Sequence, residues 1–274
     1  MDITSILGLV IGIVLIVFVG IGPSALGNFW DLNSLAIVLG GTVASVIASY
    51  PAGLLKTLLS HFKMLLRGKH YDVGTLIDTL TEMAQLARKN GLLALEEQAN
   101  QLDDEFFKQG IMLIVDATEP EEVRSMLENE LDIMATRHEE SLGIWEKAAS
   151  YAPAFGMIGT LVGLINMLKN MNLDEGGSST IGADMSVALI TTFYGCMLAN
   201  LFFSPVAKKL RIRNEEELLY KQIMIEGILA IQAGDNPKFL KEKLVTYLAQ
   251  KSRAKILDPN ASPAKKEKKG KKGD

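Results

Sequence analysis

The uncharged stretch AASYAPAFGMIGTLVGLINML, residues 148–168, decides the fold class of this chain. A helix needs about 20 apolar residues to cross the hydrocarbon layer of a bilayer, and this stretch reaches that length. Three further stretches carry no charged residue over a similar length: 3–21, 32–50 and 185–207. The sequence therefore predicts a membrane protein with four transmembrane helices.

Lysine and arginine residues set the expected orientation of these spans, because cytoplasmic loops carry an excess of them. None occurs in the connections 22–31 and 170–184, which we expect to face outward. We therefore expect both termini to be cytoplasmic, in a multi-pass protein of the bacterial inner membrane. Basic residues follow the second and fourth spans: Lys56, Lys63, Arg67, Lys69, Lys208, Lys209, Arg211 and Arg213.

The remaining sequence has helical periodicity and no run of alternating polarity, so we expect an all-α fold. Apolar residues between Val73 and Ala87 repeat at helical spacing and end at Gly91. A helix beginning near Thr118 meets no strong breaker before Pro153, which predicts an approximately 50-residue helix running into the third span. The fourth span should likewise continue as a helix to Gly234.

These patterns divide the chain into five segments. The third and fourth spans are expected to extend into the cytoplasm as long helices. The last segment is rich in Lys, Ala, Pro and Gly and cannot bury enough apolar surface to fold. The predicted segments are transmembrane helices 1 and 2 (1–51), a cytoplasmic helical domain (52–147), transmembrane helices 3 and 4 (148–208), cytoplasmic C-terminal helices (209–251) and a disordered basic tail (252–274).

Small residues and threonines form a narrow face on each of the third and fourth spans. In lipid, such residues allow helices to approach closely, so the faces could simply pack the helices of one monomer, each threonine bonding to its own helix. They could also line an ion pathway with hydroxyl groups. The candidate pathway residues are Gly156, Thr160, Gly163, Ala188, Thr192 and Gly195.

No span contains Asp, Glu, His, Lys or Arg, so this chain alone has no proton-relay carboxylate near the midplane. If it conducts ions, another subunit must supply the acid. Pro153 and Pro205 each release a backbone carbonyl near the expected cytoplasmic side. They could be simple kinks or hinges that sense ion occupancy.

A soluble active site is not predicted. His61, His70 and His138 form no ligand-spacing motif, and the single cysteine, Cys196, lies in the fourth span. We expect no enzyme activity, no bound metal, no cofactor and no nucleic-acid partner.

Arg88 and Lys89 precede Gly91, and a pair of acidic residues follows it. The acidic pair is Glu96 and Glu97. The four charged residues could be a solvated face of the protein or a docking surface for a partner of mixed charge.

Several motifs resemble the MotA/PomA family of flagellar stator A subunits. They are YAPAFGMIGTLVGLI (151–165), ALITTFYGC (188–196), Ser204-Pro205 and EGILAIQAG (226–234) with Pro237. The resemblance covers almost the whole chain, from residue 39 to about 248. Related motors of outer-membrane transport share the motif of the third and fourth spans but have three spans.

The resemblance implies a homo-oligomer, a ring of five A subunits around two B subunits. Each B subunit would have one span, a peptidoglycan-binding domain and the aspartate that this chain lacks. Ions would pass between the B helix and the third and fourth spans. Pro153 and Pro205 match the family's two functional prolines, and the charged residues at 88, 89, 96 and 97 match positions used against the rotor's switch-complex protein.

The coupling ion depends on Thr160. A hydroxyl can supply one oxygen ligand to sodium, whereas a proton needs only the aspartate. Sodium-driven members of the family have threonine at this position and proton-driven members tend to have alanine, so the resemblance favours Na⁺ over H⁺. An accessory proton-driven motor of an outer-membrane system and a non-conducting membrane scaffold are the alternatives.

Overall fold

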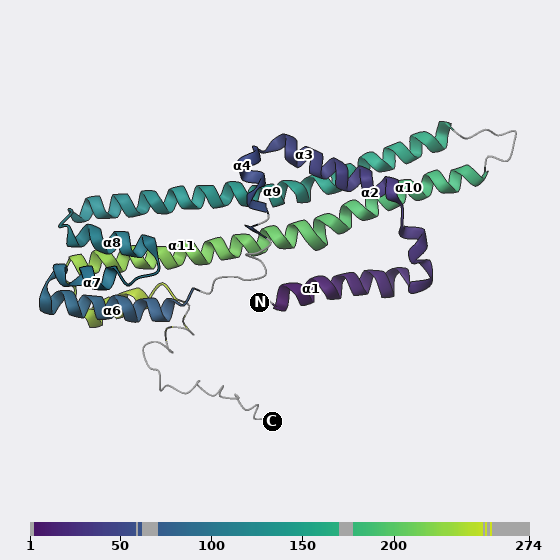
Figure 1. Cartoon of the computed structure of the whole chain (residues 1–274). Helices are drawn as coiled ribbons and strands as arrows, with labels where there is room; N and C mark the ends of the chain where they lie inside the picture. Colours follow the sequence, from purple (N-terminus) through teal and green to yellow (C-terminus); the bar gives the residue numbers. More distant parts are fainter. Residues whose placement is uncertain are drawn as a thin grey trace, which may run out of the picture. The chain divides into compact units, whose positions relative to one another are not determined.

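The computed structural model describes residues 3–58, 60–61, 71–169, 178–248, 250 and 253, with only the backbone at 3–6 and 178–180. Within them every regular element is a helix and none is a strand, in agreement with the all-α prediction (Figure 1). The predicted tail, apart from Arg253, lies outside the described residues, as do Lys63, Arg67, Lys69 and the connection 170–177.

The chain divides into two compact units, residues 1–70 with 135–215 and residues 71–134 with 216–274. The predicted domain limits, which follow the expected membrane crossings, stay a prediction. The first unit begins with α1 (Ile3–Val14), η1 (Leu15–Ile21), η2 (Pro23–Phe29), α2 (Leu32–Leu35), η3 (Ala36–Gly40), α3 (Gly41–Ser49) and α4 (Ala52–Leu55).

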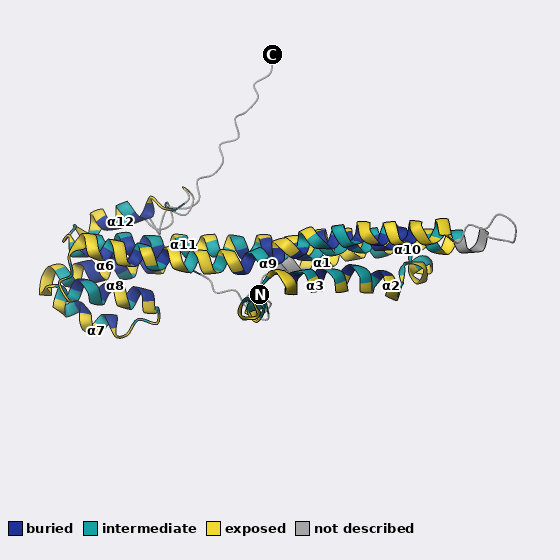
Figure 2. Cartoon of the chain, turned by 90° about the horizontal axis from the view of Figure 1, so that it is seen from above, coloured by how far each residue is buried: buried dark blue, intermediate teal, exposed yellow. Residues whose placement is uncertain are grey.

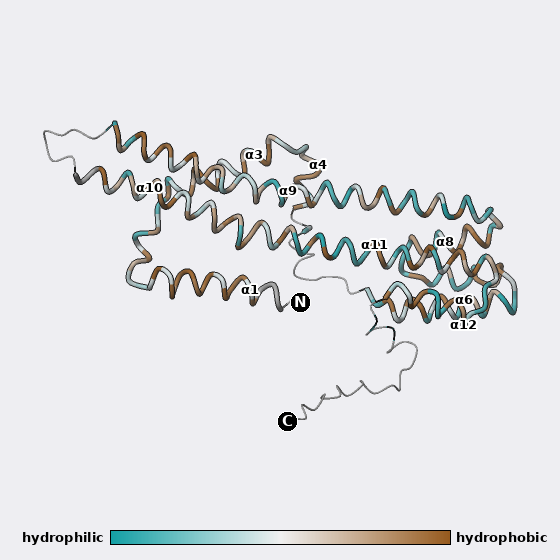
Figure 3. The backbone as a smooth tube through the Cα atoms, turned by 180° about the vertical axis from the view of Figure 1, so that it is seen from behind, coloured by the Kyte–Doolittle hydropathy of each residue, from teal (hydrophilic) through white to brown (hydrophobic). Residues whose placement is uncertain are grey.

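Two long helices carry the chain between the units. The 50-residue helix α9 (Pro120–Lys169) confirms the predicted continuation into the third span, since Pro153 lies inside it. Helices α10 (Ser178–Met197), η5 (Leu198–Phe203) and α11 (Ser204–Gln232) follow without interruption, as predicted for the fourth span. Hydrophobic residues, brown in Figure 3, predominate along α1 and α10, whereas hydrophobic and hydrophilic residues alternate along α11.

Three helices are long and apolar enough to cross a membrane: Leu32–Ser49, a window of Pro120–Lys169 and a window of Ile181–Gln232. The first predicted span is one continuous helix, α1 with η1, from Ile3 to Ile21. Its part from Leu7 to Ile21 counts as a span together with Pro23–Phe29, and the two are bent by 98°. Gly22 makes the bend with a φ of +79°, a conformation that costs glycine nothing. The number of spans is therefore three in the described residues, or four if the bent pair counts as one.

The second unit packs short helices around one apolar core. It contains α6 (Val73–Asn90), η4 (Leu92–Leu95), α7 (Glu96–Ala99), α8 (Glu105–Val115) and α12 (Pro237–Val245). Buried residues of α6 lie at helical spacing and meet Ile111, Leu127, Ile228 and Leu240. Figure 2 shows buried residues in dark blue on α6, α8 and α12.

Asp72 begins α6, its carboxylate accepting from Gly74 N at 2.9 Å, and Gly91, with a φ of +85°, ends it as predicted. A hydrogen-bonded helix cap of this kind contributes about 1 kcal/mol.

Glu226 joins three helices of the second unit. Its carboxylate accepts from Arg124 of α9 at 3.2 Å and from Lys243 of α12 at 3.0 Å, and its side chain is only 13% exposed. Burial alone would raise the pKa of Glu226, but the hydrogen bonds from Lys243 and Arg124 outweigh it and lower the pKa. The sequence motif that contains Glu226 thus has a structural role in this unit.

Replacing Glu226 by glutamine should destabilise the second unit by roughly 1–3 kcal/mol, because two cations lose a charged partner. A carboxyl group with a lowered pKa stabilises the fold above its unfolded value near 4.5, and this contribution is lost as pH falls further. Thermal unfolding of the purified protein should therefore show a deficit for Glu226→Gln that is larger at pH 7 than at pH 4. Glu128→Gln is the matched control, since Glu128 is 45% exposed. An equal deficit in the two variants would contradict this role.

Candidate functional site

Four of the predicted pathway residues lie where α9 and α10 touch. These two helices run side by side in the first unit (Figure 1). A methyl group on Gly195 would lie 2.6 Å from the Ala152 carbonyl oxygen, and one on Gly163 would lie 2.8 Å from the Asp184 carbonyl oxygen. Gly156 and Ala188 are buried in the same contact. These four residues therefore serve the close approach of two helices in one chain, as the packing interpretation predicts.

The two predicted threonines meet at the edge of that contact and remain half-exposed. Their hydroxyl oxygens are 2.5 Å apart, and the Thr160 hydroxyl also lies 3.0 Å from the Ala188 carbonyl oxygen. Thr192 Oγ1 is 3.2 Å from the same carbonyl. Three oxygen atoms from two helices thus form one cluster, and oxygen ligands of this kind suit a hard cation such as sodium.

Thr191 is the residue of this contact that sequence reasoning missed. Its side chain is fully buried and its hydroxyl donates to the Ala188 carbonyl at 2.9 Å. A methyl group on Gly159 would meet Thr191 Cγ2 at 2.4 Å. The two adjacent threonines thus have different roles, and no local sequence signal separates them, because the difference depends on where Gly159 of the opposite helix lies.

Pro153 and Pro205 lie within continuous helical structure. Pro153 is in the middle of α9, next to Gly195, whose added methyl group would be 3.1 Å from Pro153 Cα. Pro205 is the second residue of α11, which directly follows the π-helical segment η5, and the missing amide hydrogen of Pro205 interrupts the regular hydrogen-bond ladder there. Both remain candidates for conformational coupling.

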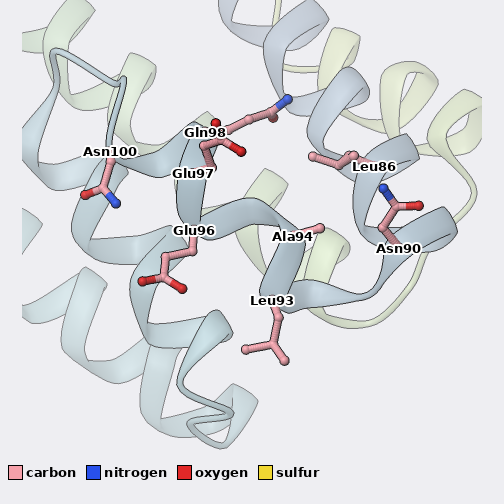
Figure 4. A pocket seen from close by; sticks show the side chains of 8 residues that line it. All are labelled: Leu86, Asn90, Leu93, Ala94, Glu96, Glu97, Gln98 and Asn100. Atoms are coloured by element: carbon pink, nitrogen blue, oxygen red, sulfur yellow. The ribbon is translucent and has the colours of Figure 1, made fainter.

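The predicted charged surface forms around the turn between α6 and α7 in the second unit. Arg88 and Lys89 lie in the last turn of α6, and Glu96 and Glu97 in the first turn of α7. All four are exposed. A pocket of about 640 Å³ opens here, lined by eight residues that include the two glutamates (Figure 4). Figure 4 shows the Leu93 and Glu96 side chains projecting away from the ribbon.

No group of three or more His, Cys, Asp or Glu side chains within the described ranges could hold a metal ion. The His61 imidazole instead accepts a hydrogen bond at Nδ1 from the Trp145 indole, at 3.0 Å. Burial and the nearby His138 lower the pKa of His61, so its ring is neutral at pH 7. This histidine therefore has a structural partner.

Comparison with known proteins gives consistent matches. The sequence model of the MotA/TolQ/ExbB proton channel family matches residues 98–223. Motility protein A of Borreliella burgdorferi is 40% identical, covering 93% of this chain and 97% of its own. Chemotaxis protein PomA of Vibrio alginolyticus is 36% identical, with coverages of 94% and 100%. The flagellar MotAB stator complex of Bacillus subtilis contains a chain with a TM-score of 0.84 and 31% identity, with coverages of 93% and 99%.

Proposed function

Because this chain belongs to the MotA/PomA family of flagellar stator A subunits, we propose that the oxygen cluster at its α9–α10 edge lies on the route of the coupling cation. The chain is an ion-channel-forming subunit of the flagellar motor stator, and this function involves no covalent chemistry. The observation that carries the proposal is the convergence of Thr160, Thr192 and the Ala188 carbonyl. Several relatives of this chain, among them that of Borreliella burgdorferi, are motility proteins, which favours this function over a scaffold or an outer-membrane motor.

The acidic group on this route comes from a second protein. None of the predicted spans contains a carboxylate, and an ion crossing hydrocarbon needs a charged or polar partner. The likeness to a MotAB complex supports a B subunit as that partner. Its membrane aspartate would bind the ion beside Thr160 and Thr192 and release it on the cytoplasmic side.

The proposal also covers the membrane topology of the chain, the composition of the stator ring and the contact with the rotor. The bent pair Leu7–Ile21 and Pro23–Phe29 counts as the first of four spans, both termini are cytoplasmic, and α9 and α11 extend into the cytoplasm. Five copies surround two B subunits, and the ring turns as ions load and unload the aspartate. Pro153 and Pro205 transmit this motion, and the charged surface at 88–97 engages the rotor's switch-complex protein.

Sodium is the proposed coupling ion, and Thr160→Ala tests it. Removing one oxygen ligand, a loss of about 1 kcal/mol, should raise the sodium concentration for half-maximal rotation roughly two- to tenfold. Rotation of tethered cells across a sodium series measures this. Thr81→Ala in the second unit is the matched control, because the hydroxyl groups of Thr160 and Thr81 both donate to the carbonyl four residues earlier in their own helix, at 3.1 Å and 2.6 Å. Unchanged rotation of the unsubstituted protein in sodium-free medium would show that the ion is not sodium.

A further inference from the structure

An apolar groove opens between the second, third and fourth predicted spans of the first unit. Its volume is about 450 Å³. Thr42, Val46 and Trp145 form a buried floor, none of them more than 7% exposed, whereas Val43 and Ile47 on the rim are 47% and 58% exposed. The floor of the groove is closed and its rim is open. In a membrane, the groove therefore opens toward lipid hydrocarbon or toward another protein.

The polar atoms of the floor are already occupied. The Thr42 hydroxyl donates to the Val38 carbonyl at 2.6 Å, and the Trp145 indole donates to His61. The lining offers no other side-chain polar atom. An occupant therefore needs no hydrogen-bonding group of its own, and a hydrocarbon chain meets this condition.

The volume favours a lipid chain over a helix lying inside the groove. A helix 10–12 Å across fills roughly 400–600 Å³ in each 5.4 Å turn, so the groove could hold about one turn at most. A single acyl chain is narrow enough to lie along it. Two π-helical segments, η3 and η5, contribute Leu39 and Phe202 to the walls, and such widened turns are frequent at functional sites.

Leu55 and Leu58, which follow the end of the second span, complete the groove, and the exposed Lys56 lies between them in sequence. Under the topology proposed above, this lysine is at the level of the cytoplasmic headgroups, where a basic residue attracts anionic lipid. We propose that the groove binds an acyl chain of an anionic phospholipid of the cytoplasmic leaflet, with Lys56 near its phosphate.

Brominated lipids test this, because bromine on an acyl chain quenches tryptophan only at contact. The chain has two tryptophans, so Trp30→Phe leaves Trp145 as its reporter. The assembled A–B complex is placed in phosphatidylethanolamine nanodiscs containing brominated phosphatidylglycerol or brominated phosphatidylethanolamine. Signal from the partner is subtracted with a complex that also carries Trp145→Phe.

Both brominated lipids should quench the fluorescence of Trp145. Brominated phosphatidylglycerol should reach the same quenching at about fivefold lower mole fraction than brominated phosphatidylethanolamine, because one lysine contributes about 1 kcal/mol toward an anionic surface. Lys56→Gln should remove the preference, and Val43→Phe, which fills the groove, should reduce quenching by both. Leu161→Phe is the control, being 59% exposed and outside the groove. Absence of quenching would overturn the proposal and show that another subunit covers the groove. Equal quenching by both lipids, unchanged by Lys56→Gln, would overturn the anionic preference.

Discussion

Gly195→Ala should abolish flagellar rotation. The added methyl group would lie 2.6 Å from the Ala152 carbonyl oxygen and 3.2 Å from Gly156 Cα, and these are backbone atoms that cannot rotate away. Overpacking of this kind costs about 1–3 kcal/mol, and here it also separates the helices that hold Thr160 and Thr192 together. Swimming of a strain whose only A subunit is the variant measures the effect, with membrane levels followed by immunoblot.

The matched control is Gly182→Ala on the same helix, where an added methyl group meets nothing within 4 Å. This variant should swim normally. If Gly195→Ala also swims normally, α9 and α10 do not need their present separation for ion passage. If it fails only because the protein disappears from the membrane, the contact is needed for assembly alone.

Exchanging the charges of the turn between α6 and α7, with Arg88→Glu and Glu97→Arg together, should also abolish swimming. The exchange keeps the net charge and leaves the buried core unchanged, since both side chains are exposed. A partner surface of fixed charge would then meet like charges at both positions, which costs several kcal/mol. Swimming and co-purification with the B subunit are measured in parallel.

Lys238→Glu with Glu242→Lys is the control for this exchange. It swaps opposite charges four residues apart on α12, both exposed and both in the second unit. Normal swimming is expected. If cells with Arg88→Glu and Glu97→Arg swim like the control cells, docking at the turn is refuted. A loss of swimming supports docking only if the variant still co-purifies with the B subunit.

The helices were predictable because their signals are local. An absence of strong breakers between Thr118 and Pro153 predicted α9, whose 50 residues begin at Pro120, and Gly91 and Gly234 marked the ends of α6 and α11. Proline 153 did not end its helix, since neighbouring helices can satisfy a carbonyl freed in a membrane span. Sequence spacing also placed the small residues and threonines on common faces.

Contacts between distant segments were not predictable, because they depend on the register in which the helices meet. Nothing local distinguishes Thr191, fully buried against Gly159, from the half-exposed Thr192 beside it. The hydrogen bond from Trp145 to His61 likewise joins segments that are distant in the sequence. Four of the six residues predicted as an ion pathway lie in the contact between α9 and α10, and their place on an ion pathway stays a prediction.

Cation flux into proteoliposomes shows whether ions pass the edge formed by Thr160 and Thr192 on a carboxylate supplied by the B subunit. We expect flux for the A–B complex, none for this chain alone, and a large loss when Thr160→Ala and Thr192→Val are combined in the complex. Equal flux from this chain alone, or from the doubly substituted complex, would contradict this expectation.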